Sequence, residues 1–336
     1  MQTQLGQETL RTGETLHILR VEPPDPLQQQ IRPFLAHKPP HYRAHIDAAL
    51  SEQCDLLETR FYLALIHDRI VGNIMTTEQQ GVGILGHVHT HPEHRRKGIC
   101  STLMHYQMND FRRRSGRILL LGTGYQSPAY HIYQRFGFRD WKTGRPGLMR
   151  YDAPEDPDFE TRFFAPAPGT VEPAQWRHWP LVALLAAVPC HLPLRSITLN
   201  LWGTDLLEGP YCEFMHCYAT APNASARVLV SATGAVVAMA TCVPDTRWHG
   251  PVHRLDLFYH PQWGTEALLP LLQALPLPER TQCYADPHDA VKIHALQQTG
   301  WHLEAVLPRQ YCIEGRWHAV HVFGKERVTP PAGTSL

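Results

Sequence analysis

The chain has 336 residues, with 31 lysines and arginines, 31 aspartates and glutamates, and 43% hydrophobic residues. This length predicts about two domains, and the apolar content is ample for packed cores. The balanced charge argues against nucleic acid or a membrane surface as the main partner.

No apolar run approaches the roughly 20 residues of a membrane span. Residues 1–8 lack the basic and apolar regions of a signal peptide. The eight cysteines are scattered and form no Cys-x-x-Cys pair, which fits reduced thiols better than a disulfide framework or a zinc ribbon. We therefore expect a cytoplasmic protein.

The first half of the chain alternates between strand and helix patterns. Alternating or short continuous apolar runs predict strands, and a period of 3.6 residues predicts helices. Expected strands are 16–21, 60–66, 70–75, 83–91, 117–122, one beginning at 138, and 147–151. Expected helices are 27–35, 41–50, one after Gly98, and 128–136.

A basic loop joins the strand 83–91 to the helix that follows Gly98. Arg95, Arg96 and Lys97 stand directly before this glycine, and the first N–H groups of a helix have no partner within it. Such groups bind anions, and a glycine lets the backbone approach them closely. The loop therefore predicts a phosphate site, and a solvated basic helix start is the alternative. It matches neither the Walker pattern nor Gly-x-Gly-x-x-Gly.

The segment 127–138 predicts another helix with clear ends. Ser127 is expected as its N-cap, and Pro128 takes the first helical position. Gly137 ends the helix, and Phe138 begins the next strand.

The basic loop resembles the pyrophosphate loop of the GNAT acyltransferase superfamily, whose pattern Gln/Arg-x-x-Gly-x-Gly/Ala holds the diphosphate of acetyl-CoA. Arg95, Gly98 and Cys100 stand at the three pattern positions, and Cys100 departs from the pattern by one small residue. We expect Cys100 to fill the glycine position. Its place at a helix start predicts a lowered pKa, so a covalent acyl-cysteine step is the alternative.

The segment Ala129-x-x-x-Tyr133-x-x-x-Gly137-Phe138 resembles the second signature of the same superfamily. The order of expected elements agrees with the resemblance over residues 14–152. The resemblance implies an α/β (α+β) fold in which a mixed, mostly antiparallel twisted sheet is flanked by helices.

The resemblance also implies which residues bind acyl-CoA and which act on it. The strand before the loop supplies backbone groups for the pantetheine arm, and the loop holds the diphosphate. The implied binding residues are Val88, His89, Thr90, Arg95, Arg96, Lys97, Gly98, Ile99, Cys100, Ser101, Ser127 and Ala129. Tyr133 matches the tyrosine that protonates the leaving thiolate, and a tyrosine that only packs on the sheet is the alternative.

The base is less clear, because many relatives use a glutamate on the strand before the loop. This chain has no glutamate between Gln79 and His91. It has His87, His89 and His91 at a period of two, so all three are expected on one face of the strand. His87 and His89 are our candidate bases. The alternatives are a histidine that only packs across strands, and an amine that arrives neutral with water as the base.

The same His-x-His-x-His pattern permits a metal ion, with Glu93 and His94 as further ligands. Two histidines at this period can share one ion, but a third ligand usually comes from elsewhere. We expect no metal, because the acyl-CoA fold already uses this strand and needs no ion.

The second half of the chain repeats the same plan, which points to a tandem protein. The expected repeat consists of a hairpin at 227–234 and 236–241, strands at 253–261 and 280–285, and helices at 265–275 and 288–299. Its loop 262–266 carries no arginine or lysine, and Leu296 stands where Tyr133 stood. We therefore expect a degenerate copy that does not bind coenzyme A in the same way.

Seven of the eight tryptophans lie after residue 160. We expect most of them to fill the core or an interface. The alternative is that one or two of them line the pocket of the acyl acceptor.

These observations divide the chain into a catalytic GNAT N-acetyltransferase domain at 1–152, a linker at 153–160 and a degenerate GNAT-like domain at 161–336. The resemblance implies two tandem GNAT folds and an acyl-CoA-dependent N-acyltransferase. Acetyl-CoA is the expected donor, and a primary amine on a small molecule or peptide attacks it directly. The alternatives are a non-catalytic acyl-CoA sensor or scaffold and a longer acyl donor. We expect no nucleic-acid or membrane partner, and either a monomer with an intramolecular pseudo-dimer or a homodimer.

Overall fold

The computed structural model describes residues 1–142, 145–218, 221 and 223–326. These residues form two compact units. The first unit consists of Met1–Glu160, Gln175–Leu184 and Tyr211–His216, and the second consists of Thr161–Ala174, Leu185–Pro210 and the chain from Cys217 onward. The chain thus returns to the first unit after residue 160, and the domain boundaries at 152 and 161 stay a prediction.

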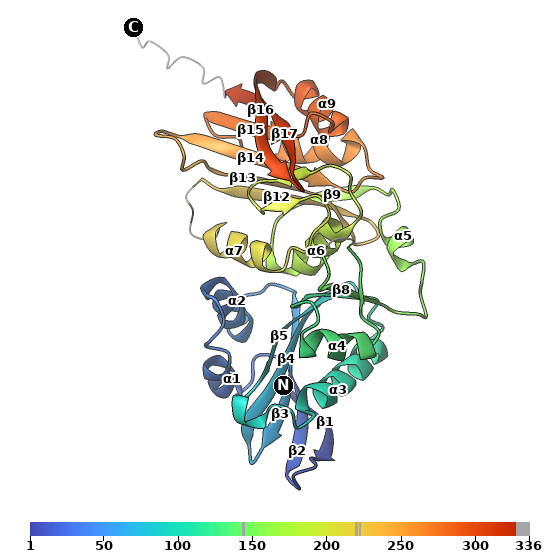
Figure 1. Ribbon diagram of the computed structural model, residues 1–336. Coiled ribbons are helices and arrows are strands. Elements are labelled where there is room, and N and C mark those ends of the chain that lie inside the picture. The colour runs from blue at the N-terminus through green and yellow to red at the C-terminus, as the bar shows by residue number, and fades with distance from the viewer. Residues whose placement is uncertain (143–144, 219–220, 222, 327–336) are drawn as a thin grey trace. The chain divides into compact units, whose positions relative to one another are not determined.

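The first unit is built on an eight-stranded sheet with the order β1-β2-β3-β4-β5-β6-β8-β7 (Figure 1). The strands are β1 (Gln2–Thr9), β2 (Thr15–Val21), β3 (Glu58–Ile66), β4 (Arg69–Gln79), β5 (Val82–Thr90), β6 (Ile118–Gly122), β7 (Arg139–Asp140) and β8 (Leu148–Asp152). Neighbouring strands are antiparallel apart from β5 and β6, which run parallel. A parallel pair needs a crossover connection, and the helix between β5 and β6 supplies it.

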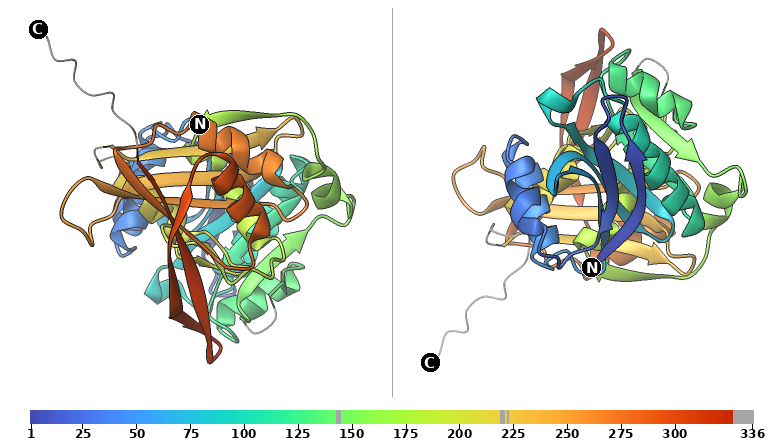
Figure 2. Two further views of the ribbon diagram at one scale, coloured as in Figure 1. Left: turned by 90° about the horizontal axis from the view of Figure 1, so that it is seen from above. Right: turned by 90° about the horizontal axis from the view of Figure 1, so that it is seen from below.

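Helices cover both faces of this sheet. They are α1 (Gln28–Phe34), α2 (Pro40–Leu50), α3 (Ile99–Arg113) and α4 (Pro128–Arg135), with a short 3-10 turn, η1 (Pro92–His94), before α3. The view from below shows α1 and α2 on one side of the sheet and α3 on the other (Figure 2). The first unit is therefore a three-layer arrangement of helix, sheet and helix.

The two layers of helices produce two hydrophobic cores, and β3 contributes to both. Tyr62 and Ala64 belong to the core under α3 and α4, whereas Phe61 and Leu63 belong to the core under α1 and α2. Successive side chains of a strand point to opposite faces, so a strand buried on both sides reads as a continuous apolar run. This is why residues 60–66 are apolar almost throughout.

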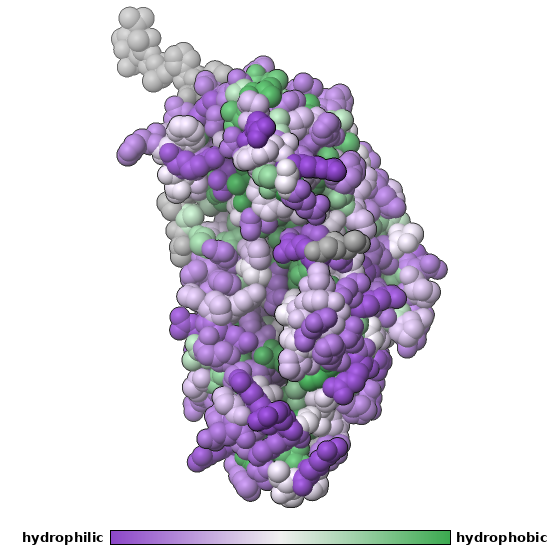
Figure 3. Space-filling view, viewed as in Figure 1, coloured by the Kyte–Doolittle hydropathy of each residue, from purple (hydrophilic) through white to green (hydrophobic). Residues whose placement is uncertain are grey.

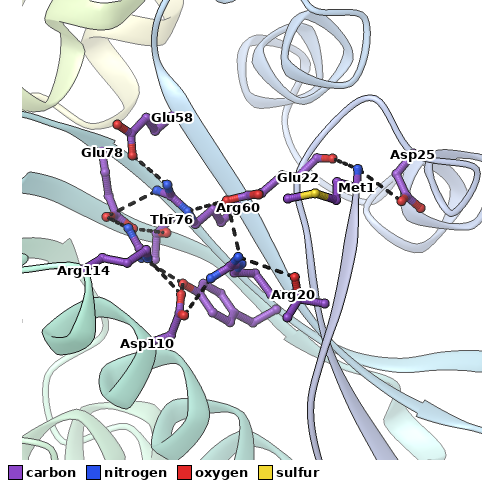
Figure 4. Close-up of polar contacts among 12 residues, drawn as sticks. Met1, Arg20, Glu22, Asp25, Glu58, Arg60, Thr76, Glu78, Asp110 and Arg114 are labelled. Atoms are coloured by element: carbon purple, nitrogen blue, oxygen red, sulfur yellow. Dashed lines mark hydrogen bonds and ion pairs between the residues drawn. The ribbon is translucent and has the colours of Figure 1, made fainter.

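The carboxyl end of α3 is held to the sheet by a network of charged side chains (Figure 4). Arg114 donates to Glu78 and Asp110, and the Tyr62 hydroxyl donates to Asp110 at 2.7 Å. The Arg60 guanidinium also lies 3.5 Å from the Glu78 carboxylate. Glu78 and Asp110 are buried, so each charge requires these partners.

The second unit contains a seven-stranded sheet with the order β16-β17-β15-β14-β13-β12-β9. Its strands are β9 (Gly169–Pro173), β12 (Ser225–Ser231), β13 (Val236–Pro244), β14 (Val252–Tyr259), β15 (Arg280–Ala285), β16 (His302–Ile313) and β17 (Arg316–Glu326). The helices α8 (Thr265–Ala274) and α9 (Ala290–Gln298) follow β14 and β15. The parallel pair in this sheet is β14 and β15.

The remaining elements lie between β8 and β12 in the sequence. They are α5 (Phe159–Phe163), the 3-10 turn η2 (Trp176–His178), α6 (Trp179–Ala187), a small pair of strands, β10 (Leu194–Ser196) and β11 (Leu201–Trp202), and α7 (Gly209–Tyr218). No helix among the described residues is long and apolar enough to cross a membrane.

The order β12-β13-β14-β15-β17-β16 in the second sheet repeats the order β3-β4-β5-β6-β8-β7 in the first, with the parallel pair at the same place. The internal repeat predicted from the sequence is therefore confirmed. So is the expectation of two mixed, mostly antiparallel sheets flanked by helices. The elements that the sequence did not predict are β1, α5, β9, α7 and the small pair β10 and β11, together with the long hairpin of β16 and β17.

Candidate active site

The loop between β5 and α3 exposes the start of a long helix. Arg96 and Gly98 adopt left-handed backbone conformations, with φ of 62° and 89°, and α3 begins at Ile99. No side chain of a described residue caps this helix, and a Cβ added to Gly98 would meet nothing within 4 Å. The N–H groups at the start of α3 therefore face open space, where the positive end of the helix dipole favours an anion.

The three cations of the loop are not equivalent. Arg96 is exposed and forms no ion pair with any described residue. Lys97 lies 3.1 Å from Glu14 of the β1–β2 turn, which neutralises part of its charge. Arg95 donates through Nε to the Thr90 carbonyl at 3.2 Å. Arg95 and Arg96 thus remain the main charges for an anion at this loop.

A β-bulge interrupts β5 just before its end. Asn73 and Met75 of β4 pair with His89 and Gly86 of β5, so β5 carries one residue more than its partner. His87 sits in this bulge with a φ of 51°. The Asn73 side-chain amide donates to the His87 carbonyl at 2.9 Å and satisfies this buried group.

Beyond the first three residues of β5, the parallel pair opens. Val82, Gly83 and Ile84 pair with residues of β6, and no later residue of β5 does so in the described chain. The carboxyl ends of the two strands therefore separate. The edge of β5 up to Thr90 becomes available to an extended group that runs along the strand.

The helix α4 begins as the sequence predicts. The Ser127 hydroxyl accepts from the Tyr130 backbone N–H at 3.1 Å, and Pro128 is the first helical residue. Gly137 follows the helix with a φ of 91°. Tyr133 of α4 is 4% exposed and its ring lies 6.0 Å from that of Phe138, measured between centroids.

Several predicted site residues share the face of the sheet under α3 and α4. Tyr133 is part of that core, and Val88, Cys100 and Ala129 pack against it. Burial raises the pKa of Cys100 to about 11, although Arg135 acts in the opposite direction. The predicted lowered pKa of Cys100 is therefore wrong, because contact with the core outweighs the effect of the helix start. Cys100 acts as a small apolar residue here.

Residues 58–140 match the family model of an acetyltransferase (GNAT) domain. This range begins with β3, ends in β7, and contains the β5–α3 loop and α4. The first unit contains a GNAT domain.

Solved structures that are similar to the chain include proteins named as acetyltransferases. One is an acetyltransferase from Streptococcus pneumoniae, with 19% identity, 47% of this chain and 99% of that chain covered, and a TM-score of 0.38. Another is yncA from Salmonella typhimurium, named as an acetyltransferase and solved with its cofactor acetyl-CoA, with 14% identity, coverage of 49% and 99%, and a TM-score of 0.38. A chimera of the Vibrio cholerae spermidine N-acetyltransferase SpeG with hSSAT has 10% identity, coverage of 47% and 95%, and a TM-score of 0.35. No curated protein matches the chain.

The two candidate bases of the GNAT domain lie on the opposite face of its sheet from Tyr133. The His87 ring lies 5.0 Å from that of Tyr42 on α2, and the His89 ring lies 5.0 Å from that of Phe34 on α1, measured between centroids. Their expected common face is therefore confirmed. His91 lies one residue beyond the end of β5, where its backbone N–H donates to the Val71 carbonyl of β4 at 2.9 Å. Its ring lies 5.9 Å from that of His94, and its place on the common face stays a prediction.

Both histidines are neutral at pH 7. Burial lowers the pKa of His87 well below its ordinary value, and nearby cationic groups lower it further. Burial, followed by His37 and Lys38, lowers the pKa of His89 to about 4. Neutral imidazoles can accept a proton, but a low pKa makes them weak bases.

Three further histidines of the GNAT domain gather near His87 and His89. His37 and His89 have ring centroids 4.1 Å apart, and His45 and His87 have ring centroids 6.1 Å apart. His41 is one of the groups whose electrostatic interaction lowers the pKa of His87. These residues were not predicted from the sequence. His41 and His45 lie four residues apart on α2, which is a signal for one side of a helix, whereas His37 precedes this helix.

The space-filling view shows the surface of the GNAT unit hollowed between the side of α1 and α2 and the side of α4 (Figure 3). The open edge of β5 lies between these two sides, as the ribbon shows (Figure 1). Among the described residues, no cluster of histidine, cysteine, aspartate or glutamate has a geometry that could hold a metal ion.

Proposed function

We propose that the GNAT domain transfers an acyl group, and specifically acetyl, from its coenzyme A thioester to a primary amine by direct attack. The observation that carries this proposal is the uncapped start of α3 behind Gly98, inside the segment that matches an acetyltransferase family model. A diphosphate needs several N–H donors and positive charge at one place. The loop from Arg95 to Ser101 has both.

The remaining binding residues follow the open edge of β5. Backbone groups of Val88, His89 and Thr90 would hold the pantetheine arm where β5 and β6 separate. Ser127 and Ala129 would border it from the start of α4. This arrangement leaves the thioester between the face that carries Tyr133 and the face that carries His87 and His89.

The reaction requires three changes at the reacting atoms. The amine nitrogen forms a bond to the acyl carbon, the bond between that carbon and sulfur breaks, and one proton moves from nitrogen toward sulfur. An amide and free coenzyme A result. A backbone N–H near Val88 polarises the acyl carbonyl, and Tyr133 donates its phenolic proton to the thiolate.

The pKa of the candidate base determines whether the amine must bind in its neutral form or can bind as an ammonium ion. A proton moved from an alkylammonium with a pKa near 10 to an imidazole with a pKa near 4 costs about 8 kcal/mol, which is too much for His89 to remove it before attack. The amine therefore arrives neutral. His87 or His89 accepts its proton only once the new bond to carbon has made that nitrogen acidic.

The variant Tyr133→Phe tests the acid. Loss of the hydroxyl should lower kcat about 100-fold or more, because general acid catalysis contributes at that level. The measurement is release of free thiol from acetyl-CoA with a panel of amines. Binding of coenzyme A should persist, because the phenyl ring retains the packing on Phe138.

A matched control is Tyr130→Phe on the same helix. Its hydroxyl donates to Asp140 at 2.5 Å, so its loss should leave kcat within a few-fold of the parent. An unchanged rate in Tyr133→Phe would remove the acid assignment. If the parent binds coenzyme A but releases no thiol with any amine, the protein is instead a sensor or scaffold for acyl-CoA.

A further inference from the structure

Flat ring side chains surround the two candidate bases on the α1 and α2 side of the sheet. The His89 ring lies 4.1 Å from that of His37 and 5.0 Å from that of Phe34, measured between centroids. The Tyr42 ring meets that of His87 edge-on at 5.0 Å. An acceptor that reaches these histidines is therefore bordered by aromatic faces and edges, which favour another flat ring.

The layer behind His87 is also made of rings. His45 is fully buried, and its ring centroid lies 5.1 Å from that of Trp176 and 4.7 Å from that of Trp179. Both tryptophans belong to the same compact unit as His87. Trp179 is 1% exposed, as expected for a tryptophan that fills the core, and a tryptophan at the acceptor pocket stays a prediction.

Three nitrogen atoms of this cluster are buried without a hydrogen-bond partner among the described residues. They are Nε2 of His87 and both ring nitrogens of His45. Buried polar atoms in proteins are almost always paired with protein, water or ligand. A neutral imidazole pairs well with an uncharged N–H or O–H group, whereas an ammonium ion is better balanced by a carboxylate.

One carboxylate, that of Asp55, lies behind this cluster, where it accepts a hydrogen bond from the Trp176 backbone N–H at 2.9 Å. In the described part of the chain, no aspartate or glutamate forms a hydrogen bond or ion pair with His37, His41, His87 or His89. Lys38 acts on both His87 and His89, Arg95 acts on His89, and both of these charges are positive. The rings alone would attract a cation weakly, and these two cations oppose that attraction.

We infer that the acceptor is an aromatic amine, uncharged at pH 7, whose ring stacks among the side chains around His87 and His89, and that it is not an aliphatic polyamine. This inference rests on the proposed acyl transfer at the same site. An aromatic amine needs no base before attack, because its nitrogen already carries a free electron pair. A negatively charged substituent on its ring is compatible with the positive charge of Lys38.

Two isomeric amines test the effect of the acceptor's charge while its size is held constant. 4-Methylaniline and benzylamine have the same atoms and one ring each, but only benzylamine is charged at pH 7. With acetyl-CoA and the thiol-release assay, kcat/KM for 4-methylaniline should exceed that for benzylamine and for spermidine at least about tenfold. A higher kcat/KM for either charged amine would overturn the inference and leave acyl transfer intact, whereas no turnover with any amine would overturn both.

The variant His37→Glu tests the role of the missing carboxylate. His37 is exposed and its ring contacts that of His89, so a carboxylate there would lie beside the acceptor. The preference for 4-methylaniline over benzylamine should fall at least about tenfold, because charge complementarity sets specificity. The control His37→Gln adds no charge and should leave the ratio within about twofold. An equal ratio in both variants would place the acceptor away from this cluster.

Discussion

His45 is fully buried among aromatic rings, and neither of its ring nitrogens bonds to a described residue. Burial lowers its pKa to about 3, so the residue is neutral in the folded protein at any moderate pH. In the unfolded chain the same side chain has a pKa of about 6.5. This difference couples protonation of His45 to unfolding.

The sign of the coupling follows from proton counts. Between pH 6.5 and pH 3 the unfolded chain binds a proton at His45 and the folded protein does not. The free energy of unfolding should therefore be highest above pH 6.5 and fall, by up to about 1.4 kcal/mol per pH unit for this residue, as the pH decreases. His87 contributes with the same sign, because burial lowers its pKa as well.

Urea unfolding of the parent and of His45→Phe at pH 7, 6 and 5 measures this effect. The variant keeps a ring of similar size. Its free energy of unfolding should vary less with pH than that of the parent, by the amount that one bound proton contributes. It also removes two unpaired nitrogens, so its stability at pH 7 should be equal to or higher than that of the parent. The control is His67→Asn in the exposed turn between β3 and β4, which should keep the parent slope. An unchanged slope in His45→Phe would contradict the buried, neutral state.

At the scale of one element, α3 joins the anion site at its start to the charged network at its end. Glu78 lies on β4 with its side chain 5% exposed, and it accepts two hydrogen bonds from Arg114. Arg60 of β3 lies 3.5 Å from the same carboxylate. The network therefore holds the helix axis against the sheet and so fixes where the N–H groups of its first turn point.

The variant Glu78→Gln should destabilise the fold strongly. It leaves Arg60 and Arg114 without their shared buried counter-charge, which costs about 3 kcal/mol in comparable sites. The matched control is Glu58→Gln. Glu58 also pairs with Arg60, but its side chain is 55% exposed, so the cost should be below about 1 kcal/mol. The free energies of unfolding from urea titration give both values, and equal effects of the two changes would show that burial is unimportant here.

The same scale shows what the sequence could and could not predict. The ends of α3 and α4 depend on local chemistry, namely Gly98, Ser127, Pro128 and Gly137, and all were predicted. The bulge of β5 depends on pairing with β4, and one extra residue there sets His87 and Leu85, two positions apart, on opposite faces. Periodicity cannot show such a shift, because it arises from a strand distant in sequence.

The whole molecule contains the same sheet order twice, but the two strand-to-helix loops differ. The second loop, before α8, contains no arginine or lysine. A Cβ on Gly264 would lie 2.6 Å from a carboxylate oxygen of Glu266, whereas one on Gly98 would meet nothing within 4 Å. The carboxylate of Glu266 thus lies close to the start of α8, where it would repel a diphosphate.

This contrast predicts one coenzyme A site per chain, located at the first loop. Isothermal titration of the full chain with coenzyme A should give about one equivalent, since α3 has an uncapped start beside Arg95 and Arg96, whereas the loop before α8 carries no arginine or lysine. The variant Gly98→Glu should abolish the binding heat, because it places a side chain and a negative charge against the anion. Gly98→Gln imposes the same backbone strain at a φ of 89° without the charge, so it should bind more weakly than the parent but more tightly than Gly98→Glu. Two equivalents in the parent, or one equivalent that persists in Gly98→Glu, would instead place a site in the second unit.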